Sequence, residues 1–287
     1  MNTLLQPKRT NAAGTMLPIG HLLRSWRERR HLSQIDLANA AEISPRHISF
    51  LETGRSAPSR AMLLRLSERL DIPLRERNTL LLSAGYAPMY SERSFDDPAL
   101  RQARAAVEMV IAGHEPYPAV AVDRHWTVVS ANAALRHLLK DLDPSLLAPP
   151  VNVLRLALHP NGLAPRVENY AQLRAHLLSR LRRQIDATAD PVLANLLEEL
   201  AALPPPATTG APDSALDEAD YGGVGVPLRI RTEYGVLAFF GTVTVFGTPI
   251  DVTLAELAIE SFFPADARTA EVLGQVARRP GGPFAKS

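Results

Sequence analysis

The stretch SPRHISFLETGR, from Ser44 to Arg55, constrains the fold of this chain more than any other segment. It predicts one short helix, because Ser44 is a favourable N-cap, proline is favoured at the next position, and Gly54 suits a helix end. Two aliphatic residues three apart can point into a core. The opposite face would carry Arg46, Ser49, Phe50 and Thr53. A phenylalanine beside an arginine on an outward face needs a binding partner to explain it.

The apolar pattern around this stretch predicts five short helices within residues 17–86. The helix before the quoted one starts after Ser33, a second N-cap. The turn AEIS separates the two helices, with Ile43 as its buried plug. Two helices joined by a tight turn form a helix-turn-helix, whose second helix enters the DNA major groove. A merely structural helical hairpin is the alternative interpretation.

Major-groove binding explains the outward face of the quoted helix. Arg46 can donate paired hydrogen bonds to a guanine, and Phe50 can contact a thymine methyl, with His47 and Ser49 beside them. Residues 1–90 contain 13 Lys and Arg against 7 Asp and Glu, a balance of +6, whereas the remaining residues carry 18 against 23, a balance of −5. A basic N-terminal part favours a polyanion as partner.

The segment LSQIDLANAAEISPRHISFLETGRSAPS closely resembles the Cro/CI-type helix-turn-helix of phage repressors and XRE-like regulators. The matching features are Gln34, Ala38, Ile48 and the LETGR tail. The resemblance implies that Gln34 contacts a phosphate and braces the second helix. It also implies base-facing positions for Arg46, His47 and Phe50, and phosphate contacts for Arg55 and Arg60.

Pro45 departs from the pattern of the phage repressors, and the role of Glu52 has two possible interpretations. Pro45 stands where several phage repressors have a base-reading amide, so that contact is missing here. Glu52 could read a base, or it could form an internal hydrogen bond or ion pair that supports the helix. The expected set of DNA-binding residues comprises Gln34, Ser44, Arg46, His47, Ser49, Phe50, Arg55 and Arg60.

After Pro116 the sequence pattern changes from helical spacing alone to a mixture of strand-like and helical segments. PAVAVDRHWTVVSAN predicts two short strands, and the segment from Val226 to Pro264 predicts three more, with helices between and after them. The N-terminal domain is therefore expected to be all-α with five helices, and the second domain α+β with an antiparallel sheet. We place flexible tails at 1–13 and 276–287, the helix-turn-helix domain at 14–90, a bridging helix at 91–115 and the second domain at 116–275. A Pro-rich and then acidic surface loop is expected at 203–220.

The wider chain is similar to the MmyB-like regulators, which carry a C-terminal PAS-like ligand-binding domain. PAVAVDRHWTVVSANAAL, NVLRLALHPNG and DPVLANLLEEL carry this looser resemblance. The resemblance implies a small apolar ligand, fatty-acid-like, in the C-terminal domain.

Five residues are candidates for the ligand site. Arg155, inside an apolar stretch, could bind a ligand carboxylate or pair with an acid of the protein. Asn132 could contact the ligand or cap its helix. The aromatic residues Trp126, Phe239 and Phe240 could line a pocket or belong to the core of the sheet.

Other function classes lack their signatures. The chain of 287 residues has no Cys, and its His residues show no metal-ligand spacing, so we assign no metal and no cofactor. No nucleophile elbow, phosphate-binding loop or membrane-length apolar run is found, so we expect a cytoplasmic protein with no membrane partner, and not an enzyme. The favoured hypothesis is a homodimer that binds an inverted-repeat operator in double-stranded DNA and responds to a ligand. The alternative is a DNA-binding regulator whose C-terminal domain is a ligand-free dimerisation or protein-interaction module.

Overall fold

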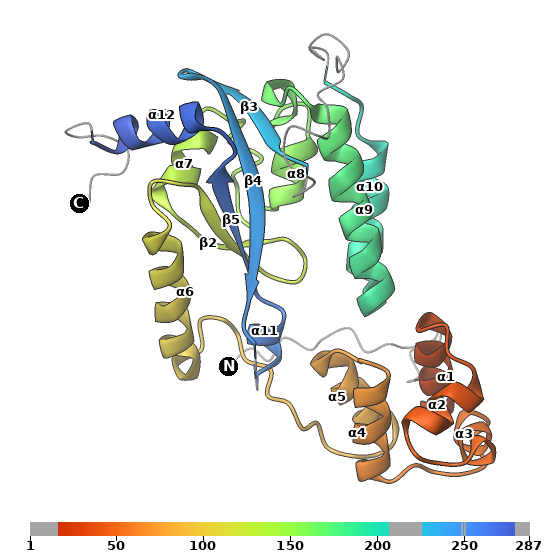
Figure 1. Ribbon diagram of the computed structural model, residues 1–287. Coiled ribbons are helices and arrows are strands. Elements are labelled where there is room, and N and C mark those ends of the chain that lie inside the picture. The colour runs from red at the N-terminus through yellow and green to blue at the C-terminus, as the bar shows by residue number, and fades with distance from the viewer. Residues whose placement is uncertain (1–16, 207–225, 248, 250, 279–287) are drawn as a thin grey trace. The chain divides into compact units, whose positions relative to one another are not determined.

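The computed structural model describes residues 17–206, 226–247, 249 and 251–278, and it divides into two compact units (Figure 1). The first unit is built mainly from residues up to Arg93, and the second mainly from Ser94 onward. The tail expected at 1–13, most of the loop expected at 203–220 and the last nine residues lie outside the described residues.

The first unit contains the five helices that the sequence predicts. They are α1 (Ile19–Arg29), α2 (Gln34–Ala40), α3 (Pro45–Glu52), α4 (Arg60–Arg69) and α5 (Leu74–Ser83). The side chains of Ser33, Ser44 and Ser59 each accept a hydrogen bond from the backbone N–H three residues later, so three of the five helices begin at a serine cap. After α5, Gly85 takes a left-handed φ of 82°, which glycine adopts without strain.

The core of the first unit fixes α3 against α1. Trp26 of α1 and Ile48 and Leu51 of α3 are almost fully buried in one cluster. Gly20 allows the two helices to approach, because a Cβ placed there would lie 2.5 Å from the backbone oxygens of Leu51 and Glu52. Any side chain at this position would push α3 away from α1.

The second unit is α+β, which confirms the predicted fold class. Its strands are β1 (Ala119–Val122), β2 (Val128–Ala131), β3 (Leu228–Thr232), β4 (Gly235–Val245) and β5 (Ala258–Pro264). They form one antiparallel sheet in the order β2-β1-β5-β4-β3. The helices are α6 (Arg101–Gly113), α7 (Ala133–Leu139), α8 (Val153–Leu158), α9 (Tyr170–Thr188), α10 (Pro191–Ala202), α11 (Val252–Ala255) and α12 (Ala267–Arg278), and the short 3-10 turns are η1 (Pro98–Leu100) and η2 (Ala164–Arg166).

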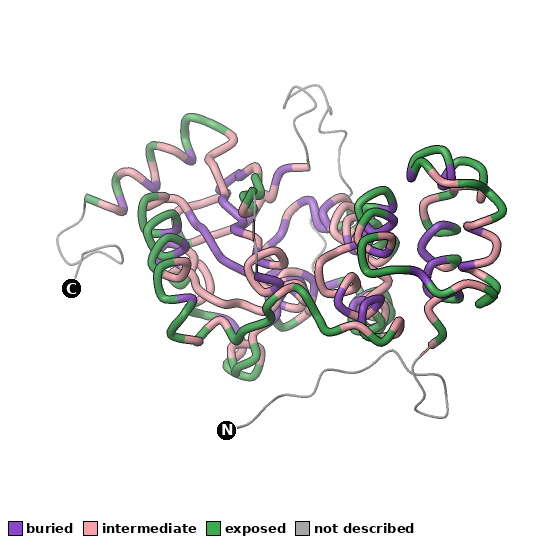
Figure 2. The backbone as a smooth tube through the Cα atoms, turned by 90° about the horizontal axis from the view of Figure 1, so that it is seen from below, coloured by how far each residue is buried: buried purple, intermediate pink, exposed green. Residues whose placement is uncertain are grey.

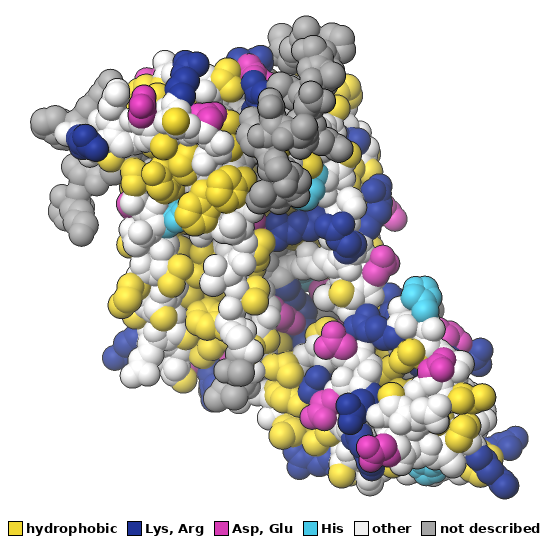
Figure 3. Space-filling model, viewed as in Figure 1, with side chains coloured by type: hydrophobic (Ala, Val, Ile, Leu, Met, Phe, Trp, Pro, Cys, Tyr) yellow, Lys and Arg dark blue, Asp and Glu magenta, His cyan; other side chains and the backbone are white. Residues whose placement is uncertain are grey.

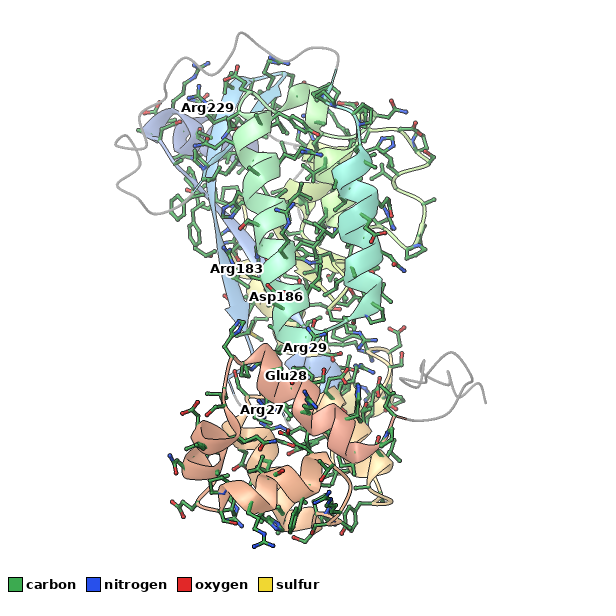
Figure 4. All side chains as sticks on the ribbon, turned by 90° about the vertical axis from the view of Figure 1, so that its right-hand side faces the viewer. Arg27, Glu28, Arg29, Arg183, Asp186 and Arg229 are labelled. Carbon is green, nitrogen blue, oxygen red and sulfur yellow. The ribbon has the colours of Figure 1, made fainter. Side chains whose placement is uncertain are left out.

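The two faces of the sheet are covered differently. Val107 and Ile111 of α6 pack with Ala119, Ala121 and Ile259 in a small cluster on one face. The larger cluster covers the other face and joins the sheet to α8, α9 and α10. All four residues of β1 are buried, and buried stretches run through the middle of this unit in Figure 2. Helices α9 and α10 run side by side in both Figure 1 and Figure 4.

Strand β4 extends beyond its neighbour β3. Residues 235–239 of β4 pair with β3 and residues 239–245 pair with β5, so beyond Phe239 the strand has no partner on its β3 side among the described strands. Residues 241–245 are exposed, with Val243 at 46% and Val245 at 61%, and patches of hydrophobic side chains are visible on this face of the second unit (Figure 3). The sheet therefore keeps one partly open edge.

Two features differ from the sequence-based predictions. Helix α8, with Leu154, Leu156 and Leu158 buried, was not predicted as a helix. The C-terminal tail was expected to begin at 276, but α12 continues to Arg278 because Val276 is buried against the domain. Within the described part of the chain, no helix combines the length and the apolar character needed to cross a bilayer.

Candidate nucleic-acid interface and ligand cavity

The outward face of α3 presents an arginine–aromatic cluster. Arg46 and Arg55 are exposed, and their guanidinium carbons lie 5.2 Å and 5.9 Å from the ring centroid of Phe50. Cation–π contacts of this kind shield the ring, so Phe50 is half-buried rather than fully exposed. Two cations and one apolar ring are thus held together where a helix of this type meets DNA.

The remaining predicted DNA-binding residues lie around this cluster. Ser44 is exposed, but its hydroxyl is engaged in capping, since it accepts a hydrogen bond from the backbone N–H of His47. His47 and Ser49 are half-buried on α3, and Arg60 is exposed at the first position of α4. All of them belong to the same unit as Arg46, so the tertiary fold brings the predicted set onto neighbouring elements.

A buried ion pair holds α3 from its inner side. Arg27 of α1 donates from Nε to Glu52 Oε1 at 2.7 Å and from one terminal nitrogen to Oε2 at 2.9 Å. The amide of Gln34 on α2 donates to the same Oε2 at 2.9 Å. The side chain of Glu52 is 3% exposed, so it supports the helix internally instead of facing a base. Its hydrogen bond raises the pKa of Arg27, which keeps the guanidinium charged despite burial (Figure 4 labels Arg27 on α1).

The second unit contains a cavity of about 130 Å³ between the sheet and its covering helices. Its lining is almost entirely apolar. The lining residues are Pro118, Val120, Trp126, Leu135, Leu138, Leu139, Val153, Leu154, Leu156, Ala157, Leu163, Val167, Leu173, Leu177, Arg180, Leu228, Ile230, Phe239, Glu260 and Phe262. An apolar cavity with a few convergent polar groups is the usual form of a small-molecule site.

The two charged residues of this lining form an ion pair. Arg180 of α9 donates from its two terminal nitrogens to the two carboxylate oxygens of Glu260 on β5, at 3.1 Å and 2.6 Å. The guanidinium carbon also lies 4.5 Å from the ring centroid of Trp126. The Glu260 side chain is 8% exposed and that of Arg180 27%. The cavity therefore combines an apolar surface with a fixed, neutralised pair of charges.

Comparisons with known proteins assign both units. Residues 23–77 match the model of a helix-turn-helix family, and residues 103–275 match the ligand-binding domain of MmyB-like transcription regulators. The chain belongs to the MmyB-like transcription regulators.

Other comparisons add little to this MmyB-like assignment. A search of curated proteins found no match. One solved structure, described as an RNA-binding Light-Oxygen-Voltage receptor, shares 14% identity, and the alignment covers 91% of this chain and 64% of that one. Its TM-score is 0.23, so we draw no argument from it.

The structure of this MmyB-like regulator separates the five candidate ligand residues. Trp126 and Phe239 line the cavity, whereas Phe240 stacks on Phe263 with ring centroids 5.4 Å apart and does not belong to the lining. Arg155 pairs with Glu199 through two hydrogen bonds of 2.6 Å and 2.7 Å, and both side chains are more than 40% exposed.

The side chain of Asn132 forms its hydrogen bonds with backbone groups of the protein. Its side-chain oxygen accepts hydrogen bonds from the backbone N–H groups of Leu135 and Ala119, and its amide donates to the carbonyl oxygen of Tyr117. Of its two sequence-based interpretations, the structure shows the helix cap, and Asn132 is not among the cavity-lining residues.

Both charged residues of the cavity are absent from the sequence-based candidates. Leu173, Leu177 and Arg180 follow one another at helical spacing, so Arg180 continues an apolar stripe and should face inward. Glu260 interrupts the apolar strand AIESFFP at an alternating position. These two signals could have marked the pair, but only the fold shows that they meet.

Proposed function

We propose that this MmyB-like protein is a ligand-responsive regulator that binds its operator with the outward face of α3. The observation that carries this proposal is the contrast between the two faces of α3. Glu52 locks the inner face to α1 and α2, while Arg46, Phe50 and Arg55 are gathered on the outer one. In this proposal Arg46, His47, Ser49 and Phe50 approach base edges, and Gln34, Ser44, Arg55 and Arg60 lie near phosphates.

We further propose a homodimer on an inverted repeat, with half-sites about one helical turn apart or a multiple of it. One eight-residue helix reads too few base pairs to be selective alone. On α6, Met109 is 74% exposed and Val110 is 46% exposed. Apolar exposure on a helix that the sequence places between the two domains supports a contact with a second copy.

The proposed ligand is a small, largely aliphatic molecule in the cavity of the second unit, with Trp126 and Phe239 among its contacts. Of the fatty-acid-like ligand that the resemblance implies, this proposal keeps the aliphatic chain and does not include the carboxylate. To regulate, this ligand must bind the DNA-competent and DNA-incompetent states unequally.

Footprinting and salt titration of the full-length protein test the DNA-binding proposal. We expect symmetric protection of two half-sites, and an affinity that falls steeply with salt because phosphate contacts release counterions. Protection of a single asymmetric half-site would contradict the dimer, and an affinity that does not depend on salt would contradict the phosphate contacts.

The ligand-free interaction module is the competing function for the second unit. Native mass spectrometry of the purified protein, followed by solvent extraction, separates the two hypotheses. We expect a bound small molecule that is released on unfolding. A protein that carries no molecule and takes up none from an apolar panel would favour the interaction module, whose partner would then contact the exposed part of the sheet or α6.

A further inference from the structure

We infer that the cavity selects an uncharged polar ligand, such as a short-chain alcohol or amide, and discriminates against carboxylic acids. The inference rests on the proposed function, because it names the chemical class of the ligand in the same cavity. Its basis is the Arg180–Glu260 pair within an otherwise apolar lining.

The cation that could bind a ligand carboxylate is already occupied. Arg180 directs both terminal nitrogens to Glu260, which is the two-point geometry that a ligand carboxylate would need. Trp126 holds the guanidinium from its ring face, and its indole N–H donates to Gln184 at 2.8 Å. Arg180 is therefore fixed in the orientation that serves Glu260.

Displacing Glu260 would be unfavourable. Its side chain is 8% exposed, so a carboxylate ligand that took its place at Arg180 would leave one nearly buried negative charge without its counterion. A ligand carboxylate beside the intact pair would meet the negative charge of Glu260. Both arrangements penalise an acid relative to a neutral molecule of the same shape.

A neutral hydroxyl or amide fits the intact pair. Each oxygen of Glu260 accepts one hydrogen bond from Arg180, and a carboxylate oxygen has capacity for a further donor. A ligand O–H or N–H can donate to Glu260 without breaking the pair. A cationic amine would also meet Glu260, but Arg180 repels it. The net neutral pair thus favours a neutral head group.

The size of the cavity limits the aliphatic part. Its volume is about 130 Å³. That is below the range of about 300–1,000 Å³ typical of drug-sized ligands. It is close to the ~150 Å³ engineered cavity that takes up benzene. We therefore choose six-carbon probes for the test.

The test compares hexanol, hexanoate and hexylamine on the full-length protein near neutral pH, by isothermal titration calorimetry and by tryptophan emission, since Trp126 lines the cavity. We expect hexanol to bind at least about tenfold more tightly than hexanoate or hexylamine, because only the charged head groups oppose a member of the ion pair. Equal or tighter binding of hexanoate or hexylamine would overturn this inference and leave the ligand-binding proposal standing. No binding of any of the three probes would overturn both.

A charge-neutralising variant sharpens the test. Glu260→Gln leaves Arg180 without its counterion, so hexanoate should gain about tenfold or more and become the preferred probe. The matched control is Glu199→Gln, which removes the partner of Arg155 outside the cavity lining and should leave the preference unchanged. An unchanged preference in a folded Glu260→Gln variant would overturn the role of the pair. If that variant does not fold, the comparison of the three probes on the wild-type protein decides alone.

Discussion

Each unit of this protein holds one nearly buried glutamate in a two-point contact with an arginine. In the DNA-binding unit, Arg27 and Glu52 are 10% and 3% exposed, and Gln34 adds a third hydrogen bond. In the ligand-binding unit, Arg180 and Glu260 are 27% and 8% exposed and line a cavity. The same chemistry is used twice, once within a packed helical core and once at the wall of a cavity.

The surroundings decide what each pair can do. Breaking the first pair leaves a nearly buried charge among packed helices, so the role of this pair is to position α3. The second pair lines a cavity that a small molecule can enter, so a ligand can contact its charged groups directly. Local geometry alone does not distinguish a structural ion pair from a recognition site.

Among the proposed variants, Glu52→Ala should have the largest effect on the free energy of unfolding. It removes the two-point contact of the nearly buried Arg27 and leaves it only the half-exposed Glu28, 3.9 Å away, so we expect a loss of about 3–5 kcal/mol in the free energy of unfolding of the first unit. Denaturant unfolding with a probe near Trp26 measures it. The control is Glu68→Ala, which removes an exposed carboxylate from α4 of the same unit and should cost less than about 1 kcal/mol. Equal losses in the two variants would remove the special role of Glu52.

The charge of Asp190, whose side chain is 12% exposed, should affect stability in a pH-dependent way. Burial alone would raise its pKa, but hydrogen bonds from His125 and the backbone N–H of Val192, together with Arg124, lower the pKa to about 2. Because the folded-state pKa is below the unfolded value, ionised Asp190 stabilises the protein above about pH 4, and this stabilisation is lost as the pH falls toward about 2.

Asp190→Asn should therefore cost up to about 2 kcal/mol at neutral pH and little at pH 2. The free energy of unfolding, measured against pH for variant and wild type, gives the difference. Glu198→Gln on the exposed side of α10 is the matched control and should change the free energy of unfolding by less than about 0.5 kcal/mol, because its side chain is exposed. A cost that stays constant from neutral pH to about pH 2 would show that the carboxylate charge is not responsible.

Arg46→Ala tests whether the outward face of α3 contributes to DNA binding and not to folding. The side chain is exposed, so the fold should be unaffected, while specific DNA binding should weaken by about 1–3 kcal/mol with relaxed preference at one base pair. Arg60→Ala should instead weaken binding to all sequences alike. Fluorescence anisotropy on an operator and on single-base variants compares them, and identical sequence profiles for the two variants would contradict the proposed division of roles.

Glu199→Ala has the smallest expected effect. Its pair with Arg155 raises the pKa of Arg155 and lowers that of Glu199, but both side chains are more than 40% exposed. Solvent screens such a pair, so we expect less than about 1 kcal/mol of stability and no change in ligand affinity. A loss comparable to that of Glu52→Ala would show that exposure is a poor guide to the role of these pairs.

The sequence by itself determined the five helices of the first unit and the outward face of α3. Serine caps, glycine ends and apolar spacing are local signals, and local signals act through hydrogen bonds within a few residues. It also determined the α+β class of the second unit, because alternating strands and helical stripes differ in period. The helix cap, one of the two roles that the sequence leaves open for Asn132, is a local signal of the same kind, since a cap bonds to its own helix.

Only the tertiary structure decided which distant charges meet. Arg155 stood out because it interrupts an apolar stretch, yet it points to Glu199, 44 residues away, rather than to the cavity. Arg180 and Glu260 lie 80 residues apart on a helix and a strand, and their pairing depends on how α9 packs against the sheet. Burial and partner choice arise from this packing, because the free energy of a charge depends on what surrounds it in space and not on its neighbours in sequence.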